Sequence, residues 1–192
     1  VKPANILLSA DGRVLVAGGG APGPEYNLSA ELFTPDYLLN GDGTPVTAAD
    51  KAAERFLREA IAADHPGDAV LGEEEDDTEG TTGRTWVIDP IDGTVNYLYG
   101  IPAYAVSVAV VVGDPAVAGA WQPVAGAVLN PESGELFHAH LGGGARLTTD
   151  AGTRTLRTTA ATDVAHALVG TGFGYAADLR RRQAELLVDL LP

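Results

Sequence analysis

Two short acidic segments carry the residues of this sequence that could do chemistry. In residues 86–97, W-V-I-D-P-I-D-G-T-V-N-Y, an apolar run that predicts a short buried strand leads into Asp89, Asp92, Gly93 and Thr94. Two nearby carboxylates repel each other unless a cation lies between them, and Mg²⁺ prefers carboxylate and phosphate oxygens. Gly93 lets the backbone approach a ligand, and a helix that begins at Thr94 would direct free N–H groups at a phosphate. The segment therefore predicts a site for a metal ion and a phosphate group.

The same residues also suit an ordinary turn, because Asp, Pro and Gly are common turn formers. A second acidic segment favours a metal site over an ordinary turn. Residues 71–75, L-G-E-E-E, pass again from apolar to acidic. If they end a neighbouring strand, their carboxylates lie on the same edge of a sheet as Asp89 and Asp92. This second segment makes us favour the metal site over the turn.

Gly72-Glu73-Glu74 together with residues 86–97 resembles the inositol monophosphatase family of Mg²⁺-dependent, lithium-sensitive phosphatases. The combination of D-P-I-D-G-T with a spaced G-E-E is specific, and it is a far stronger signal than either piece alone. The resemblance covers residues 44–192. Further similar segments are P-V-T-A-A-D at residues 45–50, G-A-V at residues 126–128 and G-E-L-F at residues 134–137.

The resemblance implies an α/β fold, the layered α+β sandwich of the inositol monophosphatase and fructose-1,6-bisphosphatase superfamily. It implies Mg²⁺ as cofactor, inhibition by Li⁺, and catalysis in which the metal polarises the phosphate ester and activates a bound water. The implied metal ligands are Glu73, Asp89, the carbonyl group of Ile91, and Asp92. The implied catalytic residues are Glu73, Asp92 and Thr94, and the implied substrate-binding residues are Asp92, Gly93 and Thr94.

The function implied is hydrolysis of a small phosphorylated alcohol, with inositol monophosphate as the default substrate. Histidinol phosphate, fructose bisphosphate and adenosine bisphosphate remain alternatives within the family. Thr44 stands where the family has a metal-binding aspartate, and the family's later W-D-x-A-A-G segment is absent from the sequence. A non-catalytic truncated or fused fragment of such an enzyme is therefore the second hypothesis.

The composition narrows the classes of protein. Of the 192 residues, 45% are hydrophobic and 20% are charged, so a packed globular unit is expected. The net charge of −14 argues against nucleic acid and anionic membranes as partners. The sequence has no cysteine, which excludes disulfides and thiolate ligands.

We expect a cytoplasmic protein, because no apolar run approaches the ~20 residues of a membrane span and no signal-peptide pattern is present. The chain begins at Val1 and contains no methionine, so we expect a fragment whose start lies upstream. The family resemblance adds the expectation of a homodimer for the full-length protein.

Residues 1–43 are expected to form an atypical N-terminal segment, distinct from the family-like domain of residues 44–192. Residues 5–8 and 13–17 predict a hairpin, and residues 30–37 predict one more strand. Residues 11–38 faintly resemble a blade of galactose oxidase-like propellers, but the copper ligands that a carbohydrate-oxidising protein needs are absent. We expect this segment to be a foreign fusion, a sequence-assembly artefact or an unusual extension, and to be functionally silent.

The elements that must position the site follow from residue 47 onward. Thr47 and Asp50 predict a capping-box-like helix start, and residues 65–67 predict its end. Its predicted apolar face contains Ala49, Ala52, Ala53, Phe56, Leu57, Ala60 and Ile61. Strands are predicted at residues 69–71, 86–88, 104–112, 123–129, 135–140 and 167–173. A last helix is predicted at residues 176–191, with Leu179, Leu186, Leu187 and Leu190 on its apolar side.

Overall fold

The computed structural model describes residues 5–8, 14–17, 38–39, 45–170 and 172–190. Thr44 and the strand predicted at residues 30–37 lie outside these residues. The strands are β1 (Asn5–Leu8), β2 (Val14–Ala17), β3 (Leu38–Leu39), β4 (Pro45–Val46), β5 (Ala69–Leu71), β6 (Arg84–Asp92), β7 (Ala105–Gly113), β8 (Trp121–Asn130), β9 (Glu135–His140), β10 (Gly144–Thr149) and β11 (Gly152–Leu156). The helices are α1 (Ala48–Asp64), α2 (Thr94–Leu98), the 3₁₀ turn Val164–His166 and α3 (Ala177–Leu190).

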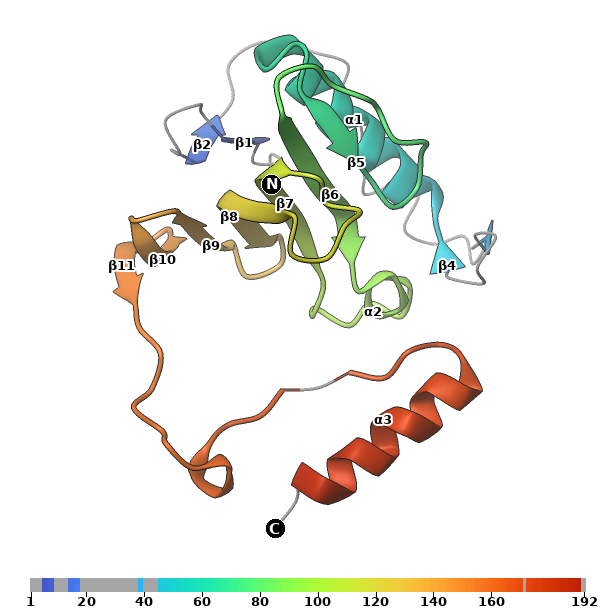
Figure 1. The fold of residues 1–192 in the computed structure, drawn as a ribbon, viewed down its shortest axis with the longest axis vertical. Helices are drawn as coiled ribbons and strands as arrows, with labels where there is room; N and C mark the ends of the chain where they lie inside the picture. Colours follow the sequence, from blue (N-terminus) through green and yellow to red (C-terminus); the bar gives the residue numbers. More distant parts are fainter. Residues whose placement is uncertain (1–4, 9–13, 18–37, 40–44, 171, 191–192) are drawn as a thin grey trace.

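One mixed sheet organises the molecule (Figure 1). Its seven strands follow the order β11-β10-β9-β8-β7-β6-β5. Strands β5 and β6 run parallel, and all other neighbours in this sheet are antiparallel. A mixed sheet with helices agrees with the expected α/β class. The predicted N-terminal hairpin is also confirmed, because β1 and β2 pair antiparallel.

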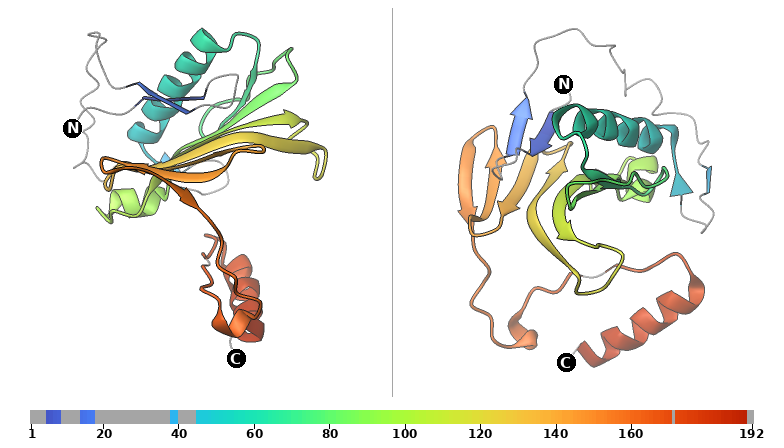
Figure 2. Two further views of the ribbon diagram at one scale, coloured as in Figure 1. Left: turned by 90° about the vertical axis from the view of Figure 1, so that its left-hand side faces the viewer. Right: turned by 45° about the horizontal axis from the view of Figure 1, so that its top comes forward.

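Helix α1 covers one face of the sheet (Figure 2). Cross-strand pairing of Trp86 with Val110 and of Ile88 with Val108 places these side chains on the face that α1 covers. The burial of this apolar surface fixes β6, and therefore the residues that follow it, beneath the helix. The core cluster consists of Leu57, Ile61, Val70, Trp86, Ile88, Val108, Val110 and Ala125.

The start of α1 is the predicted capping box. The Thr47 side chain accepts hydrogen bonds from the N–H groups of Ala49 and Asp50, and the Asp50 carboxylate accepts from the Thr47 N–H group. The predicted apolar face is only partly correct. Phe56 is 41% exposed, whereas Asp50 and Glu54 are 1% and 0% exposed. The buried face of α1 therefore carries two carboxylates among its apolar side chains.

The C-terminal part differs from the prediction. The structure places no strand at residues 167–170 or 172–173, where Leu168 and Phe173 are exposed. A strand needs a hydrogen-bonding neighbour, and none pairs with these residues in the part of the chain that the structure describes. Helix α3 forms as predicted but lies away from the sheet (Figure 1). Leu179 and Leu186 on its apolar side are exposed.

The hairpin of β10 and β11 was not predicted, because its strands are short and mostly polar. The hairpin of β8 and β9 was predicted and is confirmed. Among the described residues, no helix is both long and apolar enough to cross a membrane.

Candidate active site

The parallel pairing of β5 with β6 brings the two acidic segments together. Val70 lies opposite Trp86 and Leu71 lies opposite Val87, so both strands run toward the same edge of the sheet. Glu73 follows the end of β5, and Asp89 and Asp92 lie in the last four residues of β6. The side chains that were predicted from two separate motifs therefore meet at one corner of the molecule.

The end of β6 departs from regular pairing. Asp89 lies opposite Ser107 and Asp92 lies opposite Ala105, with a bulge between the two aspartates. Bulges redirect side chains and are common beside active sites. Ile91 is buried at this bulge, while Asp92 is exposed. The strand therefore continues through both carboxylates, where we had expected it to end before them.

Asp89 is the most perturbed carboxyl group of the site. Burial, followed by the negative charges of Glu73 and Asp92, raises the pKa of Asp89 to about 7. Its Oδ1 atom is buried and has no hydrogen-bond partner among the described residues. A buried oxygen without a partner is unfavourable unless another ligand satisfies it. A hard divalent cation beside three carboxylates would meet this need, so the donor set fits Mg²⁺.

The three carboxylates lie near one another but do not form a complete metal-coordination site. Across the described residues, no three His, Asp or Glu side chains converge closely enough to form a ready-made metal site. Glu73 and Asp92 are exposed and Asp89 is half-buried. The arrangement has one buried carboxylate oxygen, on Asp89, and two exposed side chains that can adjust to a cation.

Gly93 makes the sharp turn from β6 into α2. Its φ of 96° lies in the left-handed region, and it is the N-cap of α2. The Tyr97 N–H group donates to the Gly93 carbonyl oxygen, and Asn96 Nδ2 donates to the Ala103 carbonyl oxygen at 2.7 Å. A helix therefore begins at Thr94, and these two hydrogen bonds hold the turn in place.

We predict that Gly93→Ala lowers both stability and activity. A side chain in the left-handed region costs about 1–2 kcal/mol of unfolding free energy. The added Cβ atom would also lie 3.1 Å from the Ala103 carbonyl oxygen, which crowds the turn. Urea denaturation and phosphate release measure the two effects.

Gly100→Ala is the matched control for this prediction. Gly100 also has a positive φ, of 66°, but nothing lies within 4 Å of an added Cβ atom. It should lose stability through backbone strain alone and keep the activity of the parent chain. Equal losses of activity in the two variants would show that the turn at Gly93 has no special role.

Asp50 lies beside Thr94, whereas its sequence context predicted only a role in the helix cap. The Thr94 hydroxyl group lies 3.1 Å from the Ile91 carbonyl oxygen and 3.4 Å from Asp50 Oδ1. Burial raises the pKa of Asp50 above its usual value, despite the hydrogen bonds from Thr47. The sequence contained a signal for this interaction, because Asp50, Glu54 and Leu57 share one helix face. A carboxylate buried on an apolar face is unfavourable unless it has a hydrogen-bond or charged partner.

A histidine on β9 and three consecutive arginines on α3 could also bind ligands, but they lie outside this corner. His138 Nε2 lies 3.1 Å from the Thr148 hydroxyl group on β10, within the sheet. The arginines at residues 180–182 are exposed on α3. These residues make no contact with the carboxylates that the structure describes here.

Comparison with known proteins agrees with the motifs. The model of the inositol monophosphatase family matches residues 27–191, beginning upstream of residue 44. The inositol-1-monophosphatase SuhB of Mycobacterium tuberculosis strain H37Rv is 44% identical over 177 residues, which cover 85% of this chain and 59% of that protein. The histidinol-phosphatase of Chlorobaculum parvum is 39% identical over 136 residues, which cover 64% of this chain and 50% of that protein.

A solved structure of Mycobacterium tuberculosis SuhB superimposes with a TM-score of 0.60 and 46% sequence identity. The match covers 72% of this chain and 51% of that structure. The chain thus spans between half and three-fifths of the length of these curated relatives.

Proposed function

Because the chain belongs to the inositol monophosphatase family, we propose that it acts as a Mg²⁺-dependent phosphatase on a small phosphorylated alcohol. The observation that carries the proposal is Asp89. Its Oδ1 atom is buried without a hydrogen-bond partner among the described residues, Glu73 and Asp92 add negative charge nearby, and Thr94 begins a helix after the same strand. A cation and a phosphate monoester complement this set of groups.

The metal would be held by carboxylate oxygens of Glu73, Asp89 and Asp92 and by the carbonyl oxygen of Ile91. When bound, Mg²⁺ supplies a Lewis acid for the phosphate ester and lowers the pKa of a coordinated water. Glu73 is exposed at the end of β5, where it can also orient the attacking water. Asp92 lies on the opposite side of the bulge from Asp89, where it can hold both cation and substrate.

Thr94 would guide the attacking water. Its hydroxyl proton points to the Asp50 carboxylate or the Ile91 carbonyl oxygen, so its oxygen lone pairs remain available to accept a proton from water. Asp50 has a raised pKa and can receive the hydroxyl proton as Thr94 takes the proton of the water. The pair would thereby remove a proton from the nucleophile.

The N–H groups of Gly93 and Thr94 would hold phosphate oxygens at the start of α2. These donors are fixed before the reaction, because Gly93 and Asn96 hold the turn, so they would stabilise the developing charge without rearranging. The departing alcohol oxygen would take a proton from solvent.

We propose inositol monophosphate as the substrate, since the Mycobacterium tuberculosis relative is named an inositol-1-monophosphatase. Histidinol phosphate is the alternative, because a relative named histidinol-phosphatase also matches. Fructose bisphosphate and adenosine bisphosphate remain further alternatives within the family. Cytoplasmic location, inhibition by Li⁺ and a homodimer of the full-length protein complete the proposal.

Phosphate release from inositol 1-phosphate tests the proposal, measured with and without Mg²⁺ and then with added Li⁺. We expect turnover that requires Mg²⁺ and falls with Li⁺, and slower turnover of histidinol phosphate. Faster release from histidinol phosphate would reassign the substrate. Absence of turnover of either ester in saturating Mg²⁺ would favour the second hypothesis, a non-catalytic fragment.

A further inference from the structure

We propose that Glu54 is a positioning residue that holds the turn of Glu73, Glu74 and Glu75 and so sets the place of the Glu73 carboxylate in the metal site. The inference rests on the proposed function, since Glu73 matters only if the corner binds a cation. Glu54 belongs to α1 and contacts neither Asp89 nor Asp92 by any hydrogen bond of the described residues. Its effect on the site would be transmitted through the backbone of the turn.

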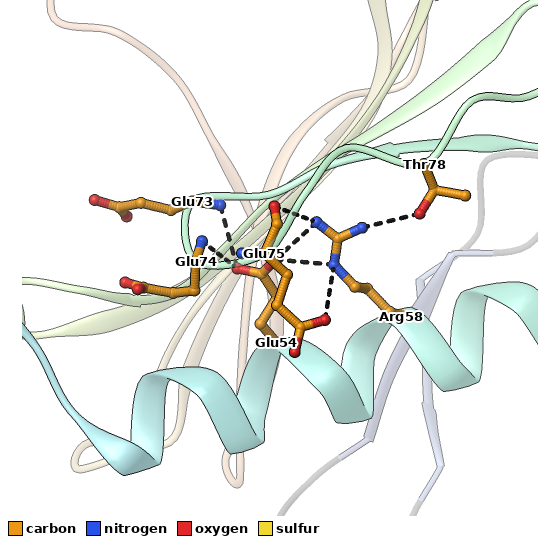
Figure 3. A network of polar contacts seen from close by, with 6 residues as sticks. All are labelled: Glu54, Arg58, Glu73, Glu74, Glu75 and Thr78. Carbon is orange, nitrogen blue, oxygen red and sulfur yellow. Dashed lines mark hydrogen bonds and ion pairs between the residues drawn. The ribbon is translucent and has the colours of Figure 1, made fainter. Parts of the chain in front are cut away.

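The Glu54 carboxylate accepts hydrogen bonds from three successive backbone N–H groups (Figure 3). Glu54 Oε2 lies 3.2 Å from the Glu73 nitrogen and 2.8 Å from the Glu74 nitrogen, and Oε1 lies 3.1 Å from the Glu75 nitrogen. The side chain is fully buried. A fully buried carboxylate with charge-assisted bonds to three consecutive amides is a strong anchor for a turn.

Arg58, one turn further along α1, completes the anchor. Its Nε and Nη2 atoms both lie 2.8 Å from Glu54 Oε1, which neutralises the buried carboxylate. The same guanidinium group donates to the Glu75 carbonyl oxygen at 3.2 Å and to the Thr78 hydroxyl group at 3.1 Å. Glu54 therefore holds the start of the turn on α1, and Arg58 holds the end of the turn on the same helix.

Gly72 shows how closely the turn is seated on Glu54. A Cβ atom at Gly72 would overlap Glu54 Oε1 and lie 2.6 Å from Arg58 Nη2. Its φ is not positive, so a larger residue here would be opposed by the ends of the Glu54 and Arg58 side chains rather than by backbone conformation. The carboxylate beneath the turn therefore favours glycine as the first residue of the G-E-E motif.

The anchor bears on the metal site through the backbone of the turn. Residues 75–83 are exposed, but Thr78 pairs with Val70 of β5, so residues 73–75 lie between that pairing and the anchor on α1. Glu73 places its charge near Asp89, whose pKa it raises. Fixing three consecutive amides sets the backbone position from which the exposed Glu73 side chain reaches the site. Partners that orient metal ligands in this way typically contribute about 10–100-fold to metal affinity.

The test compares Glu54→Gln with Asp68→Asn in the full chain. Gln keeps the shape of Glu54, but its NH₂ group must face at least one N–H group of the turn. Asp68 is the matched control, a buried carboxylate before β5 that accepts hydrogen bonds from Trp86 Nε1 at 3.0 Å and Arg84 Nε at 3.1 Å. Both variants lose a buried anion's hydrogen bonds, but only Glu54 lies under Glu73.

Two readouts follow at a temperature where thermal unfolding shows each variant to be folded. NMR hydrogen exchange should find the amides of residues 73–75 protected in the parent chain and about tenfold faster to exchange in Glu54→Gln. Binding of Mn²⁺, followed by electron paramagnetic resonance, should weaken about 10–100-fold in Glu54→Gln and less than about twofold in Asp68→Asn. Arg58→Lys should show the same direction with a smaller loss, and it replaces Glu54→Gln if that variant fails to fold.

Each outcome separates the inference from the proposed function. Fast amide exchange in the parent chain, or unchanged Mn²⁺ affinity in Glu54→Gln, overturns the positioning role whatever the phosphatase assay gives. Equal loss of Mn²⁺ affinity in Asp68→Asn assigns the effect to general destabilisation and also overturns it. A parent chain whose Mn²⁺ affinity depends on Glu54, but which hydrolyses no phosphate ester, refutes the proposed function alone.

Discussion

Asp89→Asn is expected to abolish Mg²⁺-dependent phosphate release and, in the same protein, to raise the melting temperature of the metal-free chain at pH 8. The loss of activity should be at least about 10²–10³-fold, the range found when one preorganised electrostatic contact is removed. Asn keeps the size of the side chain and removes its charge. Phosphate release with and without Mg²⁺, and thermal unfolding in EDTA, measure the two effects.

The stability effect follows from the pKa of Asp89. The folded chain raises it from 3.8 to about 7, so the folded state holds a proton that the unfolded state has released between these values. The stability that this group contributes is therefore complete below about pH 3.8 and is lost as pH rises through about 7. Asn has no charge to desolvate. The melting temperature of Asp89→Asn should therefore exceed that of the parent chain only slightly at pH 5 and most at pH 8.

Added Mg²⁺ provides the control for this prediction. It should raise the melting temperature of the parent chain at pH 8, because a ligand that binds only the folded state stabilises it, and leave Asp89→Asn unchanged. A variant that melts below the parent chain throughout pH 5–8 in EDTA would contradict the repulsion among Glu73, Asp89 and Asp92. Retained Mg²⁺-dependent turnover would remove Asp89 from the metal site.

Thr94→Val and Asp50→Asn are expected to lower the rate of phosphate release by similar factors, about 10²–10⁴-fold, with little change in Mg²⁺ affinity. Val has the shape of Thr without the hydroxyl group. In Asp50→Asn the side-chain oxygen can still cap α1 at Thr47, whose nitrogen lies 2.7 Å from Asp50 Oδ2. The NH₂ group then faces Thr94 and reverses the direction of that hydrogen bond. Steady-state kinetics across a Mg²⁺ titration measure both quantities.

Thr94→Ser is the matched variant, because it keeps the hydroxyl group and should retain most of the rate. The double variant should be little slower than either single variant, since Asp50 and Thr94 act as one unit and such losses are not additive. Fully multiplied losses in the double variant would show that the two residues act separately. A large change in Mg²⁺ affinity would place Thr94 among the metal ligands instead.

Local sequence determined several elements around the candidate site. The apolar run before Asp89 predicted a strand, which β6 contains, and a helix begins at Thr94 as the phosphate-site interpretation requires. The Thr47–Asp50 capping box correctly predicted the start of α1. These features depend on backbone geometry within a few residues, which a short segment specifies by itself.

Only the tertiary structure decided which of these residues meet. Parallel pairing of β5 with β6 placed Glu73 beside Asp89, and packing of α1 on the sheet placed Asp50 beside Thr94 and Glu54 beneath Glu73. Burial, which raises the pKa of Asp89, is likewise a property of the assembled fold. A strand was wrongly predicted at residues 167–170 and 172–173 for a related reason. A suitable composition forms no strand without a neighbour to pair with, and the described residues provide none there.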